Sequence, residues 1–179
     1  MFYTMDHRSL VGDLLLVEKD GALVGLYLEG DRYPFEPAGE EMHAGAGTPL
    51  LEQTKEWLDR YFAGEKPHTD ELSLAPAGSG FRQKVWEILC GIPYGETTTY
   101  KEIAQEIAAV QGIDKMSAQA VGGAVGHNPI SIIIPCHRVV GTNGSLTGYG
   151  GGLEKKIKLL EFEGVDMDRF FIPKKGTAL

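Results

Sequence analysis

The residues best suited to chemistry in this sequence are Pro135-Cys136-His137-Arg138, which follow the largely apolar run 130–134. A cysteine attacks as the thiolate and needs a base or a positive field nearby, and here a histidine and an arginine come directly after it. The apolar run predicts a short buried strand, which Pro135 would end because proline cannot donate to a sheet. Cys136 is then either a nucleophile held at a strand end or a packed structural cysteine, since cysteine is among the most buried residue types.

The partner groups of Cys136 follow from the geometry of an extended chain, in which adjacent side chains point to opposite faces. If this segment stays extended, the imidazole of His137 cannot touch the sulfur, and a water would have to relay the proton. A carboxylate would have to orient the imidazole, and Glu161 and Glu163 are both candidates by residue type. This geometry disfavours a cysteine hydrolase, which needs direct contact between sulfur and imidazole. Cys90 lies on an apolar helical face, so we interpret it as structural.

The composition of the 179 residues, 42% hydrophobic and 23% charged, is that of an ordinary globular protein. No apolar run approaches the roughly 20 residues that span a bilayer, and no signal peptide is visible, so we expect no membrane partner. Two cysteines favour a reducing compartment, and we expect a cytoplasmic protein. The histidines are too scattered to predict a zinc site, and we expect no metal, no cofactor and no obligatory protein partner.

The net charge of −8 is unevenly distributed along the chain. Residues 1–75 hold 6 basic and 15 acidic side chains, a net charge of −9, whereas residues 76–179 hold 11 and 10, a net charge of +1. The second part of the chain is therefore free to approach a polyanion such as DNA.

The first part of the chain predicts an α/β N-terminal domain, residues 1–75, made of a small antiparallel sheet plus a helix. Residues 14–28 predict a hairpin around Asp20-Gly21, a dipeptide that suits two-residue turns. Residues 30–47 are rich in glycine, proline and acidic groups and predict a loop. Thr48-Pro49 then opens a helix that Gly64 ends.

The second part, residues 76–179, predicts a mostly α C-terminal domain. Capping residues and apolar spacing place helices at Phe81–Cys90, Tyr100 to about Val110, Ala118–Gly126 and Leu153–Glu163. Thr98 or Thr99 caps the second of these helices and Ser117 the third. The second and third helices, joined through Gln111-Gly112, predict a helix-turn-helix in a winged-helix-like domain.

The third helix of this domain is unusual because it contains three glycines, each of which costs about 1 kcal/mol in a helix interior. Such a helix suits the close approach of another body, which is either another helix or DNA. It carries no arginine or lysine to read base edges in the major groove, which argues against a helix-turn-helix regulator. A helix lined with small residues fits the minor groove instead.

Several motifs in the second domain carry a specific resemblance. They are Phe-Arg-Gln-Lys-Val-Trp, Ile-Pro-Tyr-Gly-Glu-Thr-Thr-Thr-Tyr, Ala-Val-Gly-Gly-Ala, Asn-Pro-Ile, Pro-Cys-His-Arg-Val, Gly-Tyr-Gly-Gly-Gly-Leu and Leu-Leu-Glu-Phe-Glu-Gly. In this order, over most of residues 80–165, the chain resembles the O6-alkylguanine-DNA alkyltransferases, also called methylated-DNA–protein-cysteine methyltransferases. The N-terminal part matches the family only in size and outline.

The resemblance implies direct reversal of DNA damage in a single turnover. Cys136 would take the alkyl group from guanine O6 in duplex DNA and keep it. His137 would be bridged to Cys136 through water and held by Glu163. Asn128 would brace the site by hydrogen bonding, and Tyr100 would donate toward guanine N3.

The resemblance also implies how the substrate is bound. The base would be flipped out of the stack, because the alkyl carbon is out of reach inside it. The main-chain carbonyls of Cys136 and Val139 would accept from the guanine amine, and the third helix would enter the minor groove. The implied substrate- and DNA-binding residues are Gln119, Ala120, Gly123, Arg138, Val139, Tyr149 and Gly150.

Two residues depart from the family pattern. Gln119 stands where the family often has an arginine that enters the stack, so we expect weaker and less salt-sensitive DNA binding. Gly150 stands where many members have a serine, so its backbone N–H would have to reach O6. Relatives that bind DNA without transfer replace the cysteine, commonly by tryptophan, and the presence of Cys136 argues against that alternative.

Overall fold

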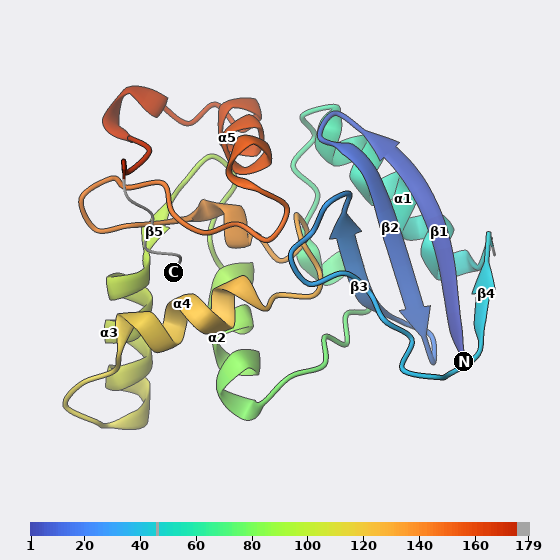
Figure 1. Cartoon of the computed structure of the whole chain (residues 1–179), viewed down its shortest axis with the longest axis horizontal. Coiled ribbons are helices and arrows are strands. Elements are labelled where there is room, and N and C mark those ends of the chain that lie inside the picture. Colours follow the sequence, from blue (N-terminus) through green and yellow to red (C-terminus); the bar gives the residue numbers. More distant parts are fainter. Residues whose placement is uncertain (46, 175–179) are drawn as a thin grey trace. The chain divides into compact units, whose positions relative to one another are not determined.

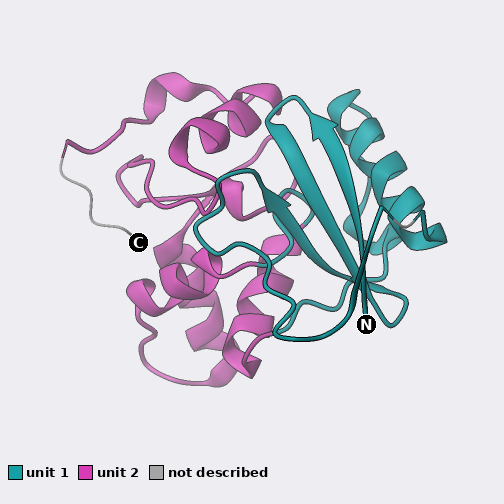
Figure 2. Ribbon diagram, turned by 45° about the vertical axis from the view of Figure 1, so that its right-hand side comes forward, with its two compact units in different colours: residues 1–77, 129–133 teal, residues 78–128, 134–179 magenta. Residues whose placement is uncertain are grey.

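The structure of the chain is a computed structural model that describes residues 1–45 and 47–174 (Figure 1). It divides into two compact units, one of residues 1–77 with 129–133 and one of residues 78–128 with the chain from 134 onward (Figure 2). The segment 129–133 thus belongs with the N-terminal unit. The predicted boundary between residues 75 and 76 assigns this segment to the C-terminal domain instead. Among the described residues, no helix is long and apolar enough to cross a membrane.

The first unit contains a four-stranded sheet in the order β3-β2-β1-β4. Its strands are β1 (Phe2–Ser9), β2 (Gly12–Lys19), β3 (Ala22–Leu28) and β4 (Met42–Ala44). The pairs β1–β2 and β2–β3 are antiparallel, but β4 pairs with β1 in parallel. The predicted small antiparallel sheet is confirmed for β1, β2 and β3, and part of the expected loop 30–47 adds β4 as a parallel edge strand, which makes the sheet mixed.

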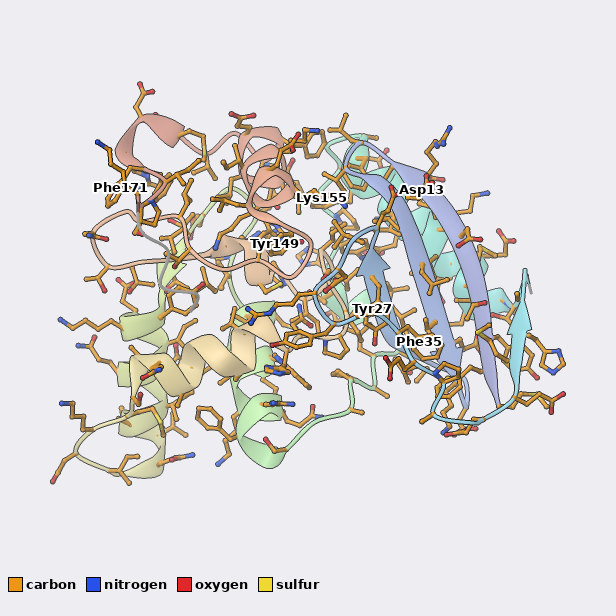
Figure 3. The ribbon with its side chains drawn as sticks, in the orientation of Figure 1. Asp13, Tyr27, Phe35, Tyr149, Lys155 and Phe171 are labelled. Carbon is orange, nitrogen blue, oxygen red and sulfur yellow. The ribbon has the colours of Figure 1, made fainter. Side chains whose placement is uncertain are left out.

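The predicted hairpin is confirmed as β2 and β3. Asp20 and Gly21 both have positive φ, 52° and 77°, as a two-residue turn that matches strand twist requires. Helix α1 (Pro49–Phe62) begins at Thr48, whose side chain accepts from the backbone N–H of Leu51. This helix packs against β1, β2 and β3 (Figure 1). On β3, the ring of Tyr27 lies 5.9 Å from that of Phe35 (Figure 3).

The segment 130–134 is not the strand that its apolar residues predict. Only Ile130 pairs, in a single bridge to Leu26 of β3, and Ser131 N–H donates to the Leu26 carbonyl at 3.0 Å. The chain then turns, with Ile132 at φ 69°, a left-handed conformation that is costly for a β-branched residue. The packing of this buried segment, not its β propensity, decides its conformation.

The second unit is mostly helical, as predicted. Its helices are α2 (Gly80–Cys90), α3 (Tyr100–Gln111), α4 (Ala118–Gly126), η2 (Cys136–Arg138), α5 (Leu153–Phe162) and η3 (Met167–Arg169). The strands β5 (Thr98–Thr99) and β6 (Val139–Val140) form a short parallel pair. The sequence predicts the bounds of α2 to α5 to within one residue.

The predicted helix-turn-helix is formed by α3 and α4, which pack against each other. Thr99 begins α3 in a capping box with Glu102, and Gly112 ends it in the left-handed conformation at φ 65°. Ser117 caps α4 as expected. On its inner side α4 is tied to α2 because Trp86 Nε1 donates to the Ala124 carbonyl at 2.9 Å.

The core next to η2 fixes both the strand that follows it and the last helix. A buried apolar cluster joins β6 to α5 and the chain beyond it, and its members are Val140, Leu146, Leu160 and Val165. Because β6 begins directly after η2, this cluster holds the Cys136–Arg138 turn against the end of α5.

Candidate active site

Cys136 lies at the first position of the 3₁₀ turn η2, not in an extended segment. Its backbone N–H donates to the carbonyl of Ile134 at 2.8 Å, and Arg138 N–H donates to that of Pro135 at 3.0 Å. The expectation that Cys136 and His137 point to opposite faces of a strand is therefore wrong in its premise. The cysteine is buried, with 6% of its surface exposed, so a substrate must enter the protein to reach it.

Asn128, just beyond the end of α4, lies beside the same turn. Its side-chain Nδ2 donates to the Ile134 carbonyl at 2.8 Å, so that oxygen accepts both from Asn128 and from the backbone of Cys136. A carbonyl has two lone pairs and can accept both bonds. Asn128 therefore fixes the backbone from which the Cys136 side chain projects.

His137 and Glu163 form a fully buried pair, with 2.6 Å between Nε2 and Oε2. Of the two glutamates that sequence leaves open, Glu163 is thus the one in contact with the imidazole, while Glu161 is exposed. Within the described residues, the other ring nitrogen, Nδ1, has no hydrogen-bond partner. Since the carboxylate holds the proton on Nε2, Nδ1 is the nitrogen that can accept another.

The carboxylate of Glu163 also accepts from Arg138 and from the loop before β5. Arg138 Nε donates to Oε1 at 2.7 Å and Nη2 to Oε2 at 3.1 Å, and Gly95 N–H donates to Oε1 at 3.1 Å. Burial alone would raise the pKa of Glu163, but hydrogen bonds from His137 and Arg138 outweigh it and hold that pKa well below its usual range. The carboxylate is therefore anionic.

The sequence predicts that Arg138 binds DNA, but in the structure its side chain points to partners within the protein. Its guanidinium is committed to Glu163 and to the Ile92 carbonyl, 2.6 Å from Nη1. Contact between this guanidinium and DNA has no support in the geometry.

The imidazole of His137 has a lowered pKa. Burial is the main cause, Glu163 opposes it, and the positive charges of Arg138 and Lys156 add to it. His137 is consequently neutral at pH 7, and a neutral imidazole can serve as a base.

Lys156 on α5 is a site residue that the sequence reasoning missed. Its Nζ is completely buried and donates to the carbonyls of Val139 at 2.5 Å and Thr147 at 2.9 Å. Burial lowers the pKa of Lys156 to about 8, and the neighbouring Cys136 sulfur opposes this shift. A signal for it existed, because Lys156 shares the inward helical face with Leu153 and Leu160.

Tyr100, at the start of α3, is buried and donates from its hydroxyl to the Thr147 carbonyl at 3.1 Å. Burial raises its pKa to about 12, so it remains a proton donor. Tyr149 and Gly150, both partly buried, lie on the connection that leads into α5, where Tyr149 is labelled in Figure 3. Cys136, His137, Glu163 and Asn128 are joined through η2, and Lys156 and Thr147 link Tyr100 to Val139.

The predicted DNA-facing residues lie on the outer side of α4. Gln119, Ala120 and Gly123 are exposed, whereas Val121 and Ala124 face inward. A Cβ added at Gly123 would meet no atom of the described residues within 4 Å outside the backbone of its own helix. The small residues therefore leave a smooth surface here and are not required for packing on this side.

These features define a protein that combines a helix-turn-helix, typical of DNA-binding proteins, with a buried cysteine beside a histidine–glutamate pair. Residues 80–165 match the family model described as the DNA binding domain of 6-O-methylguanine DNA methyltransferase. The chain belongs to the methylated-DNA–protein-cysteine methyltransferase family.

Relatives that match nearly the whole length of this chain support its membership of the family. The methylated-DNA–protein-cysteine methyltransferase of Haemophilus influenzae is 39% identical over 91% of this chain and 86% of its own. The methylated-DNA–protein-cysteine methyltransferase of Mycobacterium tuberculosis is 44% identical over 87% of this chain and 88% of its own. The crystal structure of Mycobacterium tuberculosis OGT in complex with DNA matches with a TM-score of 0.78 at 39% identity and covers 94% of each chain. The N-terminal unit is thus part of the likeness, which the sequence motifs alone did not establish.

Proposed function

We propose that this protein repairs O6-alkylguanine in duplex DNA by moving the alkyl group irreversibly onto Cys136. The observation that supports the assignment to this residue is the turn η2, in which the buried Cys136 directly precedes His137, whose imidazole pairs with Glu163. No cofactor is needed, because the protein itself is the acceptor.

The reaction begins with the thiol of Cys136 losing its proton through a water to Nδ1 of His137, whose Nε2 is held by Glu163. The sulfur attacks the alkyl carbon in line, the S–C bond forms, and the O6–C bond breaks with its electron pair left on guanine. Tyr100 donates toward N3 of the departing base, and the base finally takes up one proton, which balances the one lost by the thiol. The thioether is stable, so each molecule reacts once.

The substrate base must leave the DNA stack, because Cys136 is buried and the alkyl carbon inside a duplex is out of its reach. In the pocket, the carbonyls of Cys136 and Val139 accept from the guanine amine. The Val139 carbonyl shares its two lone pairs between Lys156 and the base. The backbone N–H of Gly150 reaches O6, and Tyr149 forms part of the wall.

The DNA lies against the outer side of α4, which enters the minor groove. Ala120 and Gly123 allow the sugar–phosphate backbone to come close, and Gln119 fills the gap left by the flipped base. The lack of base-reading arginines on α4 suits a repair protein, which must act in any sequence. We place the protein in the cytoplasm, since both of its cysteines are thiols and a reducing compartment keeps them so.

The test is incubation with a duplex that contains O6-methylguanine, followed by intact-mass measurement and peptide mapping. We expect one added methyl group on Cys136, no adduct in Cys136→Ser, and an unchanged adduct in the matched variant Cys90→Ser. Catalytic turnover, an adduct on another residue, or no adduct in the wild-type protein would reject the proposal.

A further inference from the structure

The guanidinium of Arg138 is held on three sides within the second unit. It forms a two-point ion pair with the Glu163 carboxylate, donates to the Ile92 carbonyl, and lies 5.7 Å from the centre of the Tyr94 ring. The residue is 8% exposed. Such a bidentate pair fixes both the position and the charge of its carboxylate.

The charges around His137 make this pair consequential for chemistry. A carboxylate 2.6 Å from an imidazole in a dry interior favours the imidazolium strongly, because the attraction is little screened. With Glu163 as the only charged neighbour, the histidine–glutamate pair would already hold the extra proton at neutral pH. It could not then accept the proton of Cys136.

We propose that Arg138 is a positioning residue for alkyl transfer, which balances the charge of Glu163 so that the His137–Glu163 pair stays able to accept the thiol proton. This rests on the proposed function of the same site. The hydrogen bonds of its guanidinium go to Glu163 and to the Ile92 carbonyl, so Arg138 acts through Glu163. The single turn η2 thus carries three groups: the nucleophile Cys136, the base His137, and Arg138, which sets the proton affinity of that base.

The other charged and titratable groups around the pair are consistent with this role. Lys156 adds a second positive charge from α5, while Tyr100 is uncharged because burial raises its pKa, and Tyr94 lies against Arg138. Burial is the first cause of the lowered pKa of His137, and Arg138 contributes in the same direction. Removing Arg138 therefore raises the proton affinity of the pair.

The experiment compares Arg138→Met and Arg138→Gln, which lose the charge, with Arg138→Lys, which keeps it. Single-turnover methyl transfer is measured from pH 5.5 to about 9.5, and the protonation of His137 is followed by NMR of labelled histidine in the DNA-free protein. In the two neutral variants we expect the acidic limb of the rate profile to move up by about one pH unit or more. Their rate should fall about tenfold on the acidic limb, by a smaller factor near pH 7, and largely recover at high pH. Arg138→Lys should keep the wild-type position of the limb.

Two results would overturn the proposal. One is a neutral variant that is slowed equally at every pH, which indicates a purely structural role; the other is an unchanged NMR titration of His137. If one neutral variant does not fold, the other and Arg138→Lys still decide the outcome. A wild-type protein that forms no adduct would reject the proposed function, while the NMR titration would still test the charge balance.

Discussion

The hydroxyl of Tyr100 and the ammonium of Lys156 donate to one and the same oxygen, the carbonyl of Thr147, at 3.1 and 2.9 Å. Lys156 also binds the Val139 carbonyl, so a single buried charge ties together the two segments that would line the base pocket. In the proposed function, the Tyr100 hydroxyl would exchange this carbonyl for N3 of the base.

Lys156→Met should change how stability depends on pH. Burial lowers the pKa of Lys156 in the folded protein to about 8, against 10.5 as the ordinary value. Between these values the unfolded chain binds more protons, so this lysine makes the folded state more stable as pH rises from 8 to 10.5. Denaturant unfolding should show this gain in the wild type and in Lys158→Met, an exposed control, but not in Lys156→Met. Parallel curves for the wild type and Lys156→Met would contradict it.

Glu163→Gln should destabilise the protein by about 3–5 kcal/mol at pH 7, because it leaves the buried charge of Arg138 without its partner. The pKa of Glu163 is lowered in the folded state, so its contribution is present above the unfolded pKa and is lost as pH falls toward the folded one. The difference from the wild type should therefore shrink on acidification. The exposed neighbour variant Glu161→Gln is the matched control and should behave like the wild type in urea unfolding.

Gln119→Arg should tighten binding to duplex DNA and make it more sensitive to salt. One added phosphate contact steepens the slope of log K against log salt by about 0.9. Fluorescence anisotropy at several salt concentrations measures both effects. Gln105→Arg, on the exposed side of α3, adds the same charge elsewhere. Equal effects of the two variants would mean that Gln119 does not lie at the DNA.

Gly123→Leu should separate stability from DNA binding. A Cβ at Gly123 meets no atom of the described residues within 4 Å outside its own helix backbone, and leucine favours a helix over glycine by roughly 0.5–1 kcal/mol, so we expect the fold to be kept or stabilised. If α4 approaches the DNA backbone closely, affinity should nevertheless fall about tenfold or more. Gly80→Leu at the start of α2 also enters open space and serves as the control. Unchanged binding by Gly123→Leu would remove α4 from the interface.

Local signals made much of the fold predictable from the sequence. The hairpin turn at Asp20-Gly21 and the caps at Thr48, Thr99 and Ser117 fix backbone conformation within a few residues, and the structure has all of them. Strand β4 carries no such signal, because it exists only through its pairing with β1.

The conformation around Cys136 could not be predicted from local sequence signals. A run of isoleucines predicts a strand, yet tertiary contacts impose a bridge at Ile130 and a turn at Cys136. The contact of His137 with Glu163 joins residues 26 positions apart, and residue types alone left Glu161 equally eligible. The helical spacing places Lys156 on the inward face of α5, but the carbonyls that satisfy its ammonium come from Val139 and Thr147, which the sequence of α5 does not reveal.

The five residues 129–133 determine how the protein can be divided into fragments. The chain leaves the helical unit after Asn128, adds Ile130 to the edge of β3, and returns at Ile134, two residues before Cys136. A fragment that starts at Gly78 would keep the helix-turn-helix but would lose the surface on which this excursion rests. The N-terminal unit thus holds this segment through backbone hydrogen bonds at Leu26, and cutting the unit away would remove those bonds from the loop that leads to Cys136.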